Sequence, residues 1–436
     1  MTTLNDLTSC IAQFDPNAMP VHAAQAIVRQ WAVPVATVER VALRAALNRV
    51  LAEDIASPID VPAHDNSAMD GYAFDGAALS GHASSGGDTL TLRVAGQAFA
   101  GHPFEHAAAS GECVRIMTGA AMPAGCDTVV PQEFVTRAEN GNISFDPQRL
   151  ARGANCRHAG EDLAKGQSAL RAGRILRSSD LGLLASLGIG EVAVRRRLRV
   201  AFLSTGDELR SIGEPLPAGC VYDSNRYTLF AMLERLNVDT LDLGVVRDEP
   251  AALEAALRQA AESADVVLTS GGVSVGEADF TRKMLQTFGD VAFWSMAMRP
   301  GRPLAFGRVW SGGRPAEGRP ALFFGLPGNP VAVMVTFYQI VREALVAMSG
   351  AEPQAPLSFA ATSTQPLRKR AGRTEFLRGI ATRDADGRWR VAPTRSQSSG
   401  VLSSMSEANC FIVLAHDQTD VGAGEAVDIM PFDGLI

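Results

Sequence analysis

Glycine and acidic residues gather at four places in the central part of the sequence, each directly after an apolar run. The Gly271-Gly272 pair in one of these loops would let backbone N–H groups approach an anion closely. A single loop of this kind is more often a turn or a helix cap than a site. Four of them at successive strand ends favour a site that binds phosphate groups. The loops span residues 204–208, 247–250, 270–279 and 325–330.

Three carboxylates in these loops, Glu208, Asp248 and Asp279, would converge as hard oxygen donors. Such donors suit Mg²⁺ held against phosphates, so we predict these residues as metal ligands. The glycine-containing loops around residues 270 and 328 would contact the substrate. The predicted substrate-binding residues there are Ser270, Gly271, Gly272, Ser274, Pro327, Gly328 and Asn329.

Three further polar segments could form sites or only turns. Residues 299–303 place the guanidinium groups of Arg299 and Arg302 on a proline-stiffened loop, a geometry suited to an oxyanion. A solvated basic turn is an equally good interpretation. Residues 65–72 and 115–120 are rich in hydroxyl and carboxylate groups, and turns with local capping bonds would also explain them.

From about residue 198 the sequence alternates between strand and helix patterns. This alternation is typical of a doubly wound α/β domain with a parallel sheet. Ligands bind such sheets at the carboxyl ends of the strands, where the four loops lie. Strands are predicted at 199–204, 238–245 and 265–269 and near 291, 304 and 321, and helices at 225–236, 250–263, from about 280, and at 331–348.

Two other regions have β patterns. Residues 88–145 are short alternating runs separated by Gly, Pro and Asn-Gly, which predicts a small β domain. Residues 355–436 return to short strands with Gly and Asp turns, which predicts a C-terminal β barrel. Near the start, apolar residues at helical spacing predict helices over 21–31 and 41–50.

The bulk composition excludes several classes of protein. A net charge of −7 with both signs mixed along the chain argues against nucleic-acid binding. We find no secretory signal pattern and no apolar stretch of roughly 18 residues that would cross a bilayer. The 6 cysteines are scattered singly and the 7 histidines have no metal-ligand spacing. This pattern predicts a cytoplasmic protein with reduced thiols and neither disulfides nor a zinc site.

Taken together, these segments closely resemble the molybdopterin molybdenumtransferase family, which includes the E domain of gephyrin. The resemblance runs from about residue 21 to 431, with the motifs in one order. The motifs are DVPAHDNSAMDGYAF from Asp60, RIMTGAAMPAGCDTVVPQE from Arg115, AGEDLAKG from Ala159, FLSTGDEL from Phe202, VYDSNR from Val221, SGGVSVGEADFT from Ser270 and GLPGNPVAV from Gly325.

The resemblance implies a multidomain homodimer. The implied domains are an elongated helical linker (1–45 and 155–197), an inserted β domain (46–154), an α/β molybdopterin-binding domain (198–350) and the C-terminal β barrel (351–436). The implied active cleft lies between the α/β domain of one subunit and the inserted β domain of the other. The implied reaction takes adenylated molybdopterin and molybdate, uses Mg²⁺ and releases AMP. Transient contacts with the adenylating enzyme and with molybdoenzyme maturation proteins are implied as well.

The resemblance also implies roles for individual residues. Asp65 and Thr118 would face the partner's cleft, and Asp162 would lie beside Arg157, a substrate-binding residue. The predicted catalytic set comprises Asp65, Thr118, Asp162, Glu208, Asp248 and Asp279. Arg299, Arg302, Arg378 and Ser399 would hold molybdate and phosphate. Related proteins often carry lysines where this chain has Ser295, Arg299 and Arg302, so its binding of oxyanions is expected to differ in detail.

Two alternatives remain, one a different enzyme and one a protein of another class. The chain could be a molybdopterin adenylyltransferase, although the adenylating proteins resemble only the α/β part. It could also be a non-catalytic scaffold like gephyrin at synapses, although the acidic residues argue that chemistry is retained.

Overall fold

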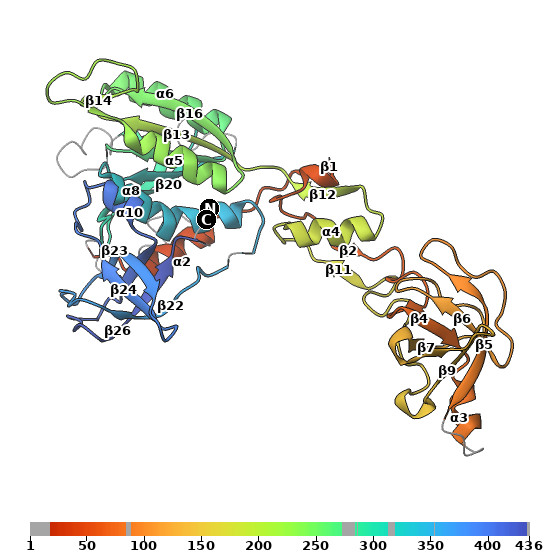
Figure 1. The fold of residues 1–436 in the computed structure, drawn as a ribbon. Coiled ribbons are helices and arrows are strands. Elements are labelled where there is room, and N and C mark those ends of the chain that lie inside the picture. Colours follow the sequence, from red (N-terminus) through yellow and green to blue (C-terminus); the bar gives the residue numbers. More distant parts are fainter. Residues whose placement is uncertain are drawn as a thin grey trace.

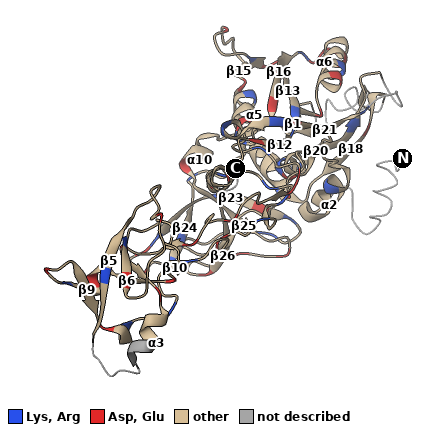
Figure 2. Ribbon diagram, turned by 90° about the vertical axis from the view of Figure 1, so that its right-hand side faces the viewer, with Lys and Arg blue, Asp and Glu red and all other residues tan. Residues whose placement is uncertain are grey.

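The computed structural model describes residues 18–83, 89–272, 284–285, 287–312, 319–352 and 354–433. The molecule is elongated, with a large body at one end, a narrow linker, and a small β sheet at the other end, here called the distal sheet (Figure 1). Acidic and basic residues are scattered along the ribbon of both the body and the distal sheet (Figure 2). This distribution agrees with the mixed charge pattern of the sequence.

A mixed sheet in the order β16-β13-β17-β21-β20-β18 forms the centre of the large body. Its first four strands are parallel, which confirms the predicted sheet. The strands β20 and β18 are antiparallel, because only residues 296–302 join them and a parallel pair needs a longer crossover. The bounds are β13 (Arg199–Thr205), β16 (Asp239–Val246), β17 (Val266–Ser270), β18 (Gly289–Ser295), β20 (Pro303–Val309) and β21 (Ala321–Leu326).

Helices α5 (Ser224–Arg235) and α6 (Pro250–Ser263) cover opposite faces of this sheet. Leu229 of α5 packs in one core cluster with Phe202 of β13. Leu253 of α6 packs in a different cluster with Leu203, the next residue of β13. Successive side chains of a strand point to opposite faces, so the two helices lie on opposite sides. The doubly wound arrangement is thereby confirmed.

A 19-residue helix from Pro330 to Met348 runs through the core of the body. By length and composition alone it could cross a membrane. However, 67% of its most apolar window is buried inside the protein, so its composition is that of a core helix. The helix comprises α8 (Pro330–Thr336), the π-helical turn η4 (Phe337–Val341) and α9 (Arg342–Met348), and α2 (Val21–Trp31) packs against it.

The linker is built from short antiparallel pairs and one helix. The predicted helix over 41–50 is wrong, because the chain forms β1 (Val38–Ala42) and the 3-10 turn η1 (Leu43–Ala45) instead. Pairing of β1 with β12 (Glu191–Arg195) supplies backbone hydrogen bonds that outweigh the local helical pattern. The other elements are β2 (Ile55–Ala56), which pairs with β11 (Ser168–Leu170), and α4 (Ser178–Ser186).

The distal sheet has the order β7-β4-β6-β5-β9-β8, which confirms the small β domain. The short strands β3 (Asn66–Ser67) and β10 (Cys156–Arg157) pair with each other beside it. Its elements are β4 (Gly71–Phe74), α3 (Ala77–Ala83), β5 (Leu90–Ala98), β6 (Glu112–Ile116), β7 (Thr128–Pro131), η2 (Gln132–Phe134), β8 (Thr136–Arg137), β9 (Asn142–Phe145) and η3 (Pro147–Arg149).

The C-terminal strands form a closed barrel in the order β23-β24-β22-β26-β25, because β25 also pairs with β23. The predicted barrel is confirmed. The short strand β19 (Met298–Arg299) pairs with β23, so the segment between β18 and β20 lies against the barrel. The remaining elements are β14 (Leu209–Arg210), β15 (Val221–Tyr222), β22 (Phe359–Ser363), β23 (Thr374–Arg383), β24 (Trp389–Pro393), α10 (Ser403–Glu407), β25 (Cys410–Leu414) and β26 (Ala426–Pro431).

Candidate active site

A cavity of about 800 Å³ opens at the carboxyl ends of β13, β17 and β21, between the central sheet and a loop of the barrel. Ten of the predicted site residues line it. They are Glu208, Asp248, Gly271, Gly272, Arg299, Arg302, Pro327, Gly328, Asn329 and Ser399. Two further predicted residues, Ser274 and Asp279, lie outside the described residues.

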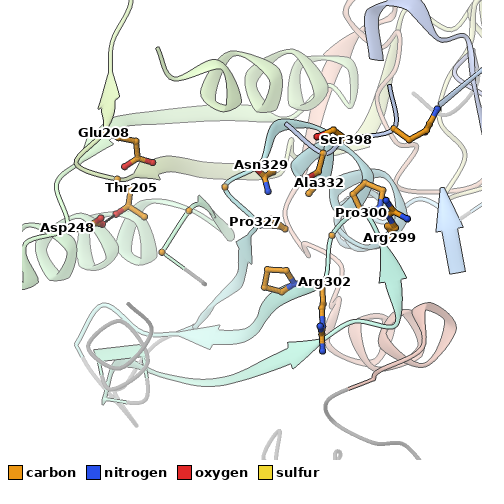
Figure 3. Close-up of a pocket in the computed structure, with 18 residues that line it drawn as sticks. Thr205, Glu208, Asp248, Arg299, Pro300, Arg302, Pro327, Asn329, Ala332 and Ser398 are labelled. Atoms are coloured by element: carbon orange, nitrogen blue, oxygen red, sulfur yellow. Dashed lines mark hydrogen bonds between the residues drawn. The ribbon is translucent and has the colours of Figure 1, made fainter. Parts of the chain in front are cut away.

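The acidic groups lie at one end of the pocket. Glu208 follows β13 and Asp248 follows β16, and Figure 3 shows both beside Thr205. The Thr205 hydroxyl donates a hydrogen bond to the Asp248 carboxylate. A Cβ at Gly206 would lie 2.5 Å from Glu208 Oε2, so a larger residue there would displace this carboxylate from its present position. This end therefore offers exposed hard oxygen donors, the ligand type that a magnesium ion prefers.

The next loop brings backbone into the floor of the pocket. Gly271 has φ +92°, and a Cβ at this position would lie 2.3 Å from the carbonyl oxygen of Thr205. Glycine is required because its backbone conformation is left-handed and because it lies against a neighbouring strand. This geometry is consistent with the prediction that the glycine pair lets backbone N–H groups approach an anion closely.

Asn225, on the first turn of α5, connects two of the loops and was not predicted as a site residue. Its amide nitrogen Nδ2 donates hydrogen bonds to Ser270 Oγ at 2.8 Å and to the Gly328 carbonyl at 2.6 Å. Ser270 is thus held behind the pocket wall and does not line the cavity. Two signals in the sequence could have found it: Asn225 lies in the motif VYDSNR and at the start of the helix predicted over 225–236.

Arginine side chains lie at the other end of the pocket (Figure 3). Arg302 Nε donates a hydrogen bond to Ser295 Oγ at 2.9 Å. Arg299 Nη1 lies 3.9 Å from Glu375 Oε2, but that buried carboxylate is already bound by Arg373 at 2.7 Å. The Arg299 guanidinium is half exposed, so it can reach an anion in the pocket. Ser295, where a lysine was expected, therefore orients a neighbouring cation.

Arg378 supports the barrel loop from behind and does not line the cavity. Its side chain is buried and donates to the carbonyl oxygens of Ser396 and Ser398 at 3.2 and 3.1 Å. Burial, reinforced by the nearby positive charge of Arg299, lowers the pKa of Arg378 to about 10. The loop in turn reaches α8, where the Val331 N–H donates to the Ser399 carbonyl at 3.1 Å.

The other four predicted residues, Asp65, Thr118, Arg157 and Asp162, lie near the distal sheet, and none of them lines this pocket. Asp65 accepts a hydrogen bond from the Ala159 N–H at 2.8 Å, the main reason why its pKa lies below the usual value. Thr118 donates through both its N–H and its hydroxyl to Asp70 Oδ1, at 2.8 and 2.7 Å, and these bonds lower the pKa of Asp70. Within one chain, the predicted site residues therefore form two separate groups.

Three family models match the chain in order. They describe the MoeA N-terminal region (domain I and II) over residues 19–188, a probable molybdopterin binding domain over 201–347, and the MoeA C-terminal region (domain IV) over 360–432. A molybdopterin molybdenumtransferase of Haemophilus influenzae is 44% identical over 415 residues, which cover 95% of this chain and 98% of the relative. The chain belongs to the molybdopterin molybdenumtransferase family.

Other members of the molybdopterin molybdenumtransferase family agree with this assignment. A relative from a Nostoc species is 35% identical, with 90% of this chain and 88% of the relative covered. The crystal structure of a molybdopterin biosynthesis moeA protein from Pyrococcus horikoshii superposes with a TM-score of 0.79 at 28% identity. That match covers 95% of this chain and 100% of the other. The family fold predicted from the motifs is thereby confirmed.

Proposed function

We propose that this chain inserts molybdenum from molybdate into adenylated molybdopterin and releases AMP. The observation that carries the proposal is the division of the pocket into a carboxylate end and a guanidinium end (Figure 3). The substrates differ in the same way, because a nucleotide-linked pyrophosphate needs a cation and molybdate is an anion that needs cationic donors. One cavity of about 800 Å³ can therefore bind the pyrophosphate with its cation at one end and molybdate at the other.

At the carboxylate end, Glu208 and Asp248 would hold Mg²⁺, together with the predicted ligand Asp279. The fit rests on the donor set, since exposed carboxylates and the Thr205 hydroxyl are hard oxygen groups. When bound, the ion would neutralise charge on the pyrophosphate as AMP leaves. The contribution of Thr205 is to orient Asp248 through its hydrogen bond.

At the guanidinium end, Arg299 and Arg302 would bind molybdate through charge-assisted hydrogen bonds. Arg378 positions the 396–398 loop against this end of the pocket. As the P–O–P link between the pterin phosphate and AMP breaks, one oxygen of molybdate bonds to the phosphorus and AMP leaves. Two Mo–O bonds are thereby replaced by bonds from molybdenum to the two dithiolene sulfurs, and the second displaced oxygen leaves as water with the two thiol protons. All reacting atoms belong to the substrates, so these residues act by positioning and electrostatics.

The distal residues require a second copy of the chain in this proposal. Asp65, Thr118, Arg157 and Asp162 are absent from the pocket of their own chain, and the extended shape holds the distal sheet away from the body (Figure 1). We infer a homodimer in which each distal sheet completes the pocket of the partner. The same proposal includes the domain limits given above and a cytoplasmic location. It also includes transient contacts with the adenylating enzyme and with molybdoenzyme maturation proteins.

Release of AMP tests the proposed reaction. The purified chain is incubated with adenylated molybdopterin and Mg²⁺, with and without molybdate. We expect AMP only when molybdate is present, together with dithiolene-bound molybdenum. AMP release that does not depend on molybdate, or its complete absence, contradicts the proposal. Formation of adenylated molybdopterin from ATP would instead identify an adenylyltransferase.

A further inference from the structure

A second group of metal-ligating side chains lies beside the distal sheet, where β3 pairs with β10. Asp65, Cys156 and His158 bring a carboxylate oxygen, a thiol sulfur and a ring nitrogen within 4.8 Å of one another. Within the described ranges of the chain, no other set of three or more such ligands is this close. Within one chain the cluster lies apart from the acidic end of the pocket, and in the proposed dimer it would border the pocket of the partner. It differs from the acidic end in chemistry, because it combines sulfur, nitrogen and oxygen.

Strand pairing explains why these three residues meet. Cys156 lies opposite Ser67 in the antiparallel ladder, and the same register continued by two residues brings His158 opposite Asp65. Alternate residues of a strand share a face, so Cys156 and His158 point to the same side. Opposite residues on one face have neighbouring side chains. The Asp65 Oδ2 indeed lies 3.2 Å from His158 Nδ1.

Backbone hydrogen bonds hold two of the ligands in place. Asp65 Oδ1 accepts from the Ala159 N–H at 2.8 Å, which leaves Oδ2 directed at the His158 ring. The His158 N–H donates to Glu161 Oε2 at 2.9 Å, which fixes the backbone at that residue. The group is thus oriented before any ion binds, and the cost of ordering it is reduced.

The local charge favours a cation. Burial and then the negative charges of Asp65, Asp127 and Glu161 raise the pKa of the Cys156 thiol. Asp127 is already paired with Arg152, so the carboxylates left to attract a positive ion are those of Asp65 and Glu161. A bound divalent ion would displace the thiol proton to solvent as the metal–sulfur bond forms. The side chains of Asp65 and His158 are 49% and 66% exposed, so an ion can reach them from solvent.

We propose that Asp65, Cys156 and His158 form a binding site for a divalent transition metal of the zinc class. Thiolate, imidazole and carboxylate are the three ligand types that zinc takes in proteins, whereas Mg²⁺ prefers oxygen alone. Three protein ligands leave one tetrahedral position open to water or to a small anion. Bonds of about 2.0–2.3 Å require the ligand atoms, which lie within 4.8 Å of one another, to draw closer together around the ion.

Cobalt(II) is the probe that tests this site. The full-length chain, freed of metal and kept under argon, is titrated with Co²⁺ while the near-ultraviolet absorption is recorded. We expect a thiolate-to-cobalt charge-transfer band that saturates at one ion per chain and disappears when Zn²⁺ is added. The readout does not depend on AMP release, so failure of the metal-site proposal can be distinguished from failure of the proposed function.

Two variants and a matched control assign the ligands. Cys156→Ser and His158→Asn should each abolish the band, whereas Cys220→Ser, at another partly exposed thiol outside the cluster, should keep it. Thermal melting of the metal-free proteins checks that the variants fold, and Zn²⁺ should raise the Tm of the wild type and of Cys220→Ser only. Absence of the band in the wild type, or a band that persists in Cys156→Ser, would overturn the proposal.

Discussion

Asn225 and Ser270 are joined by a 2.8 Å hydrogen bond across 45 residues of sequence, from the first turn of α5 to the end of β17. The same amide also binds the Gly328 carbonyl at the end of β21. Two loops of the pocket are therefore anchored to one buried side chain. Their positions depend on a residue that does not itself line the cavity.

Replacing this anchor should destabilise the large body. In Asn225→Ala, two buried acceptors lose their donor, which costs about 1–3 kcal/mol of unfolding free energy. Thermal melting and urea unfolding measure the loss, and the KM for the pterin substrate should rise because the loops are no longer held. The exposed substitution Ala231→Ser on the same helix is the control, with little expected change. An unchanged Tm in Asn225→Ala would show that the two bonds contribute nothing to stability.

The carboxylate end should govern dependence on Mg²⁺. Asp248→Asn keeps the shape of the side chain but removes a negative charge, so we expect molybdate-dependent AMP release to fall by about 10²-fold or more. Raising the Mg²⁺ concentration should recover part of the activity. Glu249→Gln, at the exposed neighbour 67% accessible to solvent, is the matched control and should remain active. Equal losses in both variants would refute the assignment of Asp248 to the metal.

The guanidinium end should govern affinity for molybdate. Arg302→Ala removes a charge-assisted donor worth about 1.5–3 kcal/mol, so the molybdate KM should rise roughly 10–100-fold while the pterin KM changes little. Ser295→Ala should have a smaller effect in the same direction, because it removes only the group that orients Arg302. Arg247→Ala, 80% exposed, serves as the charge control. A selective rise in the pterin KM would instead place the arginine beside the phosphates.

The ion pair of Asp265 should make stability sensitive to acid. Burial alone would raise the pKa of Asp265, but hydrogen bonds from Arg196 at 2.9 and 3.0 Å and from the Arg199 N–H hold it below the ordinary value of 3.8. A depressed folded pKa means that the stabilisation is present above about pH 4 and is lost as the pH falls through the folded value.

Comparison with Asp265→Asn isolates this contribution. At pH 7 the variant should be less stable by about 3–5 kcal/mol, because Arg196 then lacks its charged partner. As the pH falls from about 4 through the lower folded pKa of Asp265, the two Tm values should converge, since the wild-type carboxylate becomes protonated. A Tm difference that stays constant from pH 7 to pH 3 would contradict the pairing.

Mixed dimers test whether distal residues act across subunits. Asp248→Asn and Asp65→Asn homodimers should each be nearly inactive. After subunit exchange, about a quarter of wild-type activity should return, because half of the dimers are mixed and each mixed dimer contains one intact pocket. A mixture of Asp248→Asn with Glu208→Gln is the control and should recover nothing, since both changes lie at the same end of one pocket. No recovery in the first mixture would refute the shared site.

Much of the pocket could be predicted because its residues follow strands directly. In a parallel sheet all carboxyl ends meet at one edge, so Glu208, Asp248 and Gly271 come together once the strand–helix alternation is recognised. The helix predicted over 41–50 was wrong because the structure of this segment depends on a strand that is distant in the sequence. Its local pattern was outweighed by pairing with β12, a partner about 150 residues away that no local pattern reveals.

By itself, the sequence determined the family, the alternation of strands and helices, and the loops that carry carboxylates and glycines. Only the tertiary structure decided that Asn225 anchors two of those loops, that Arg378 lies behind the pocket wall, and that Cys156 and His158 meet Asp65. These relationships depend on which strands pair, and in what register. Register is fixed by packing and hydrogen bonding over the whole chain, whereas a sequence pattern reports only on neighbours along it.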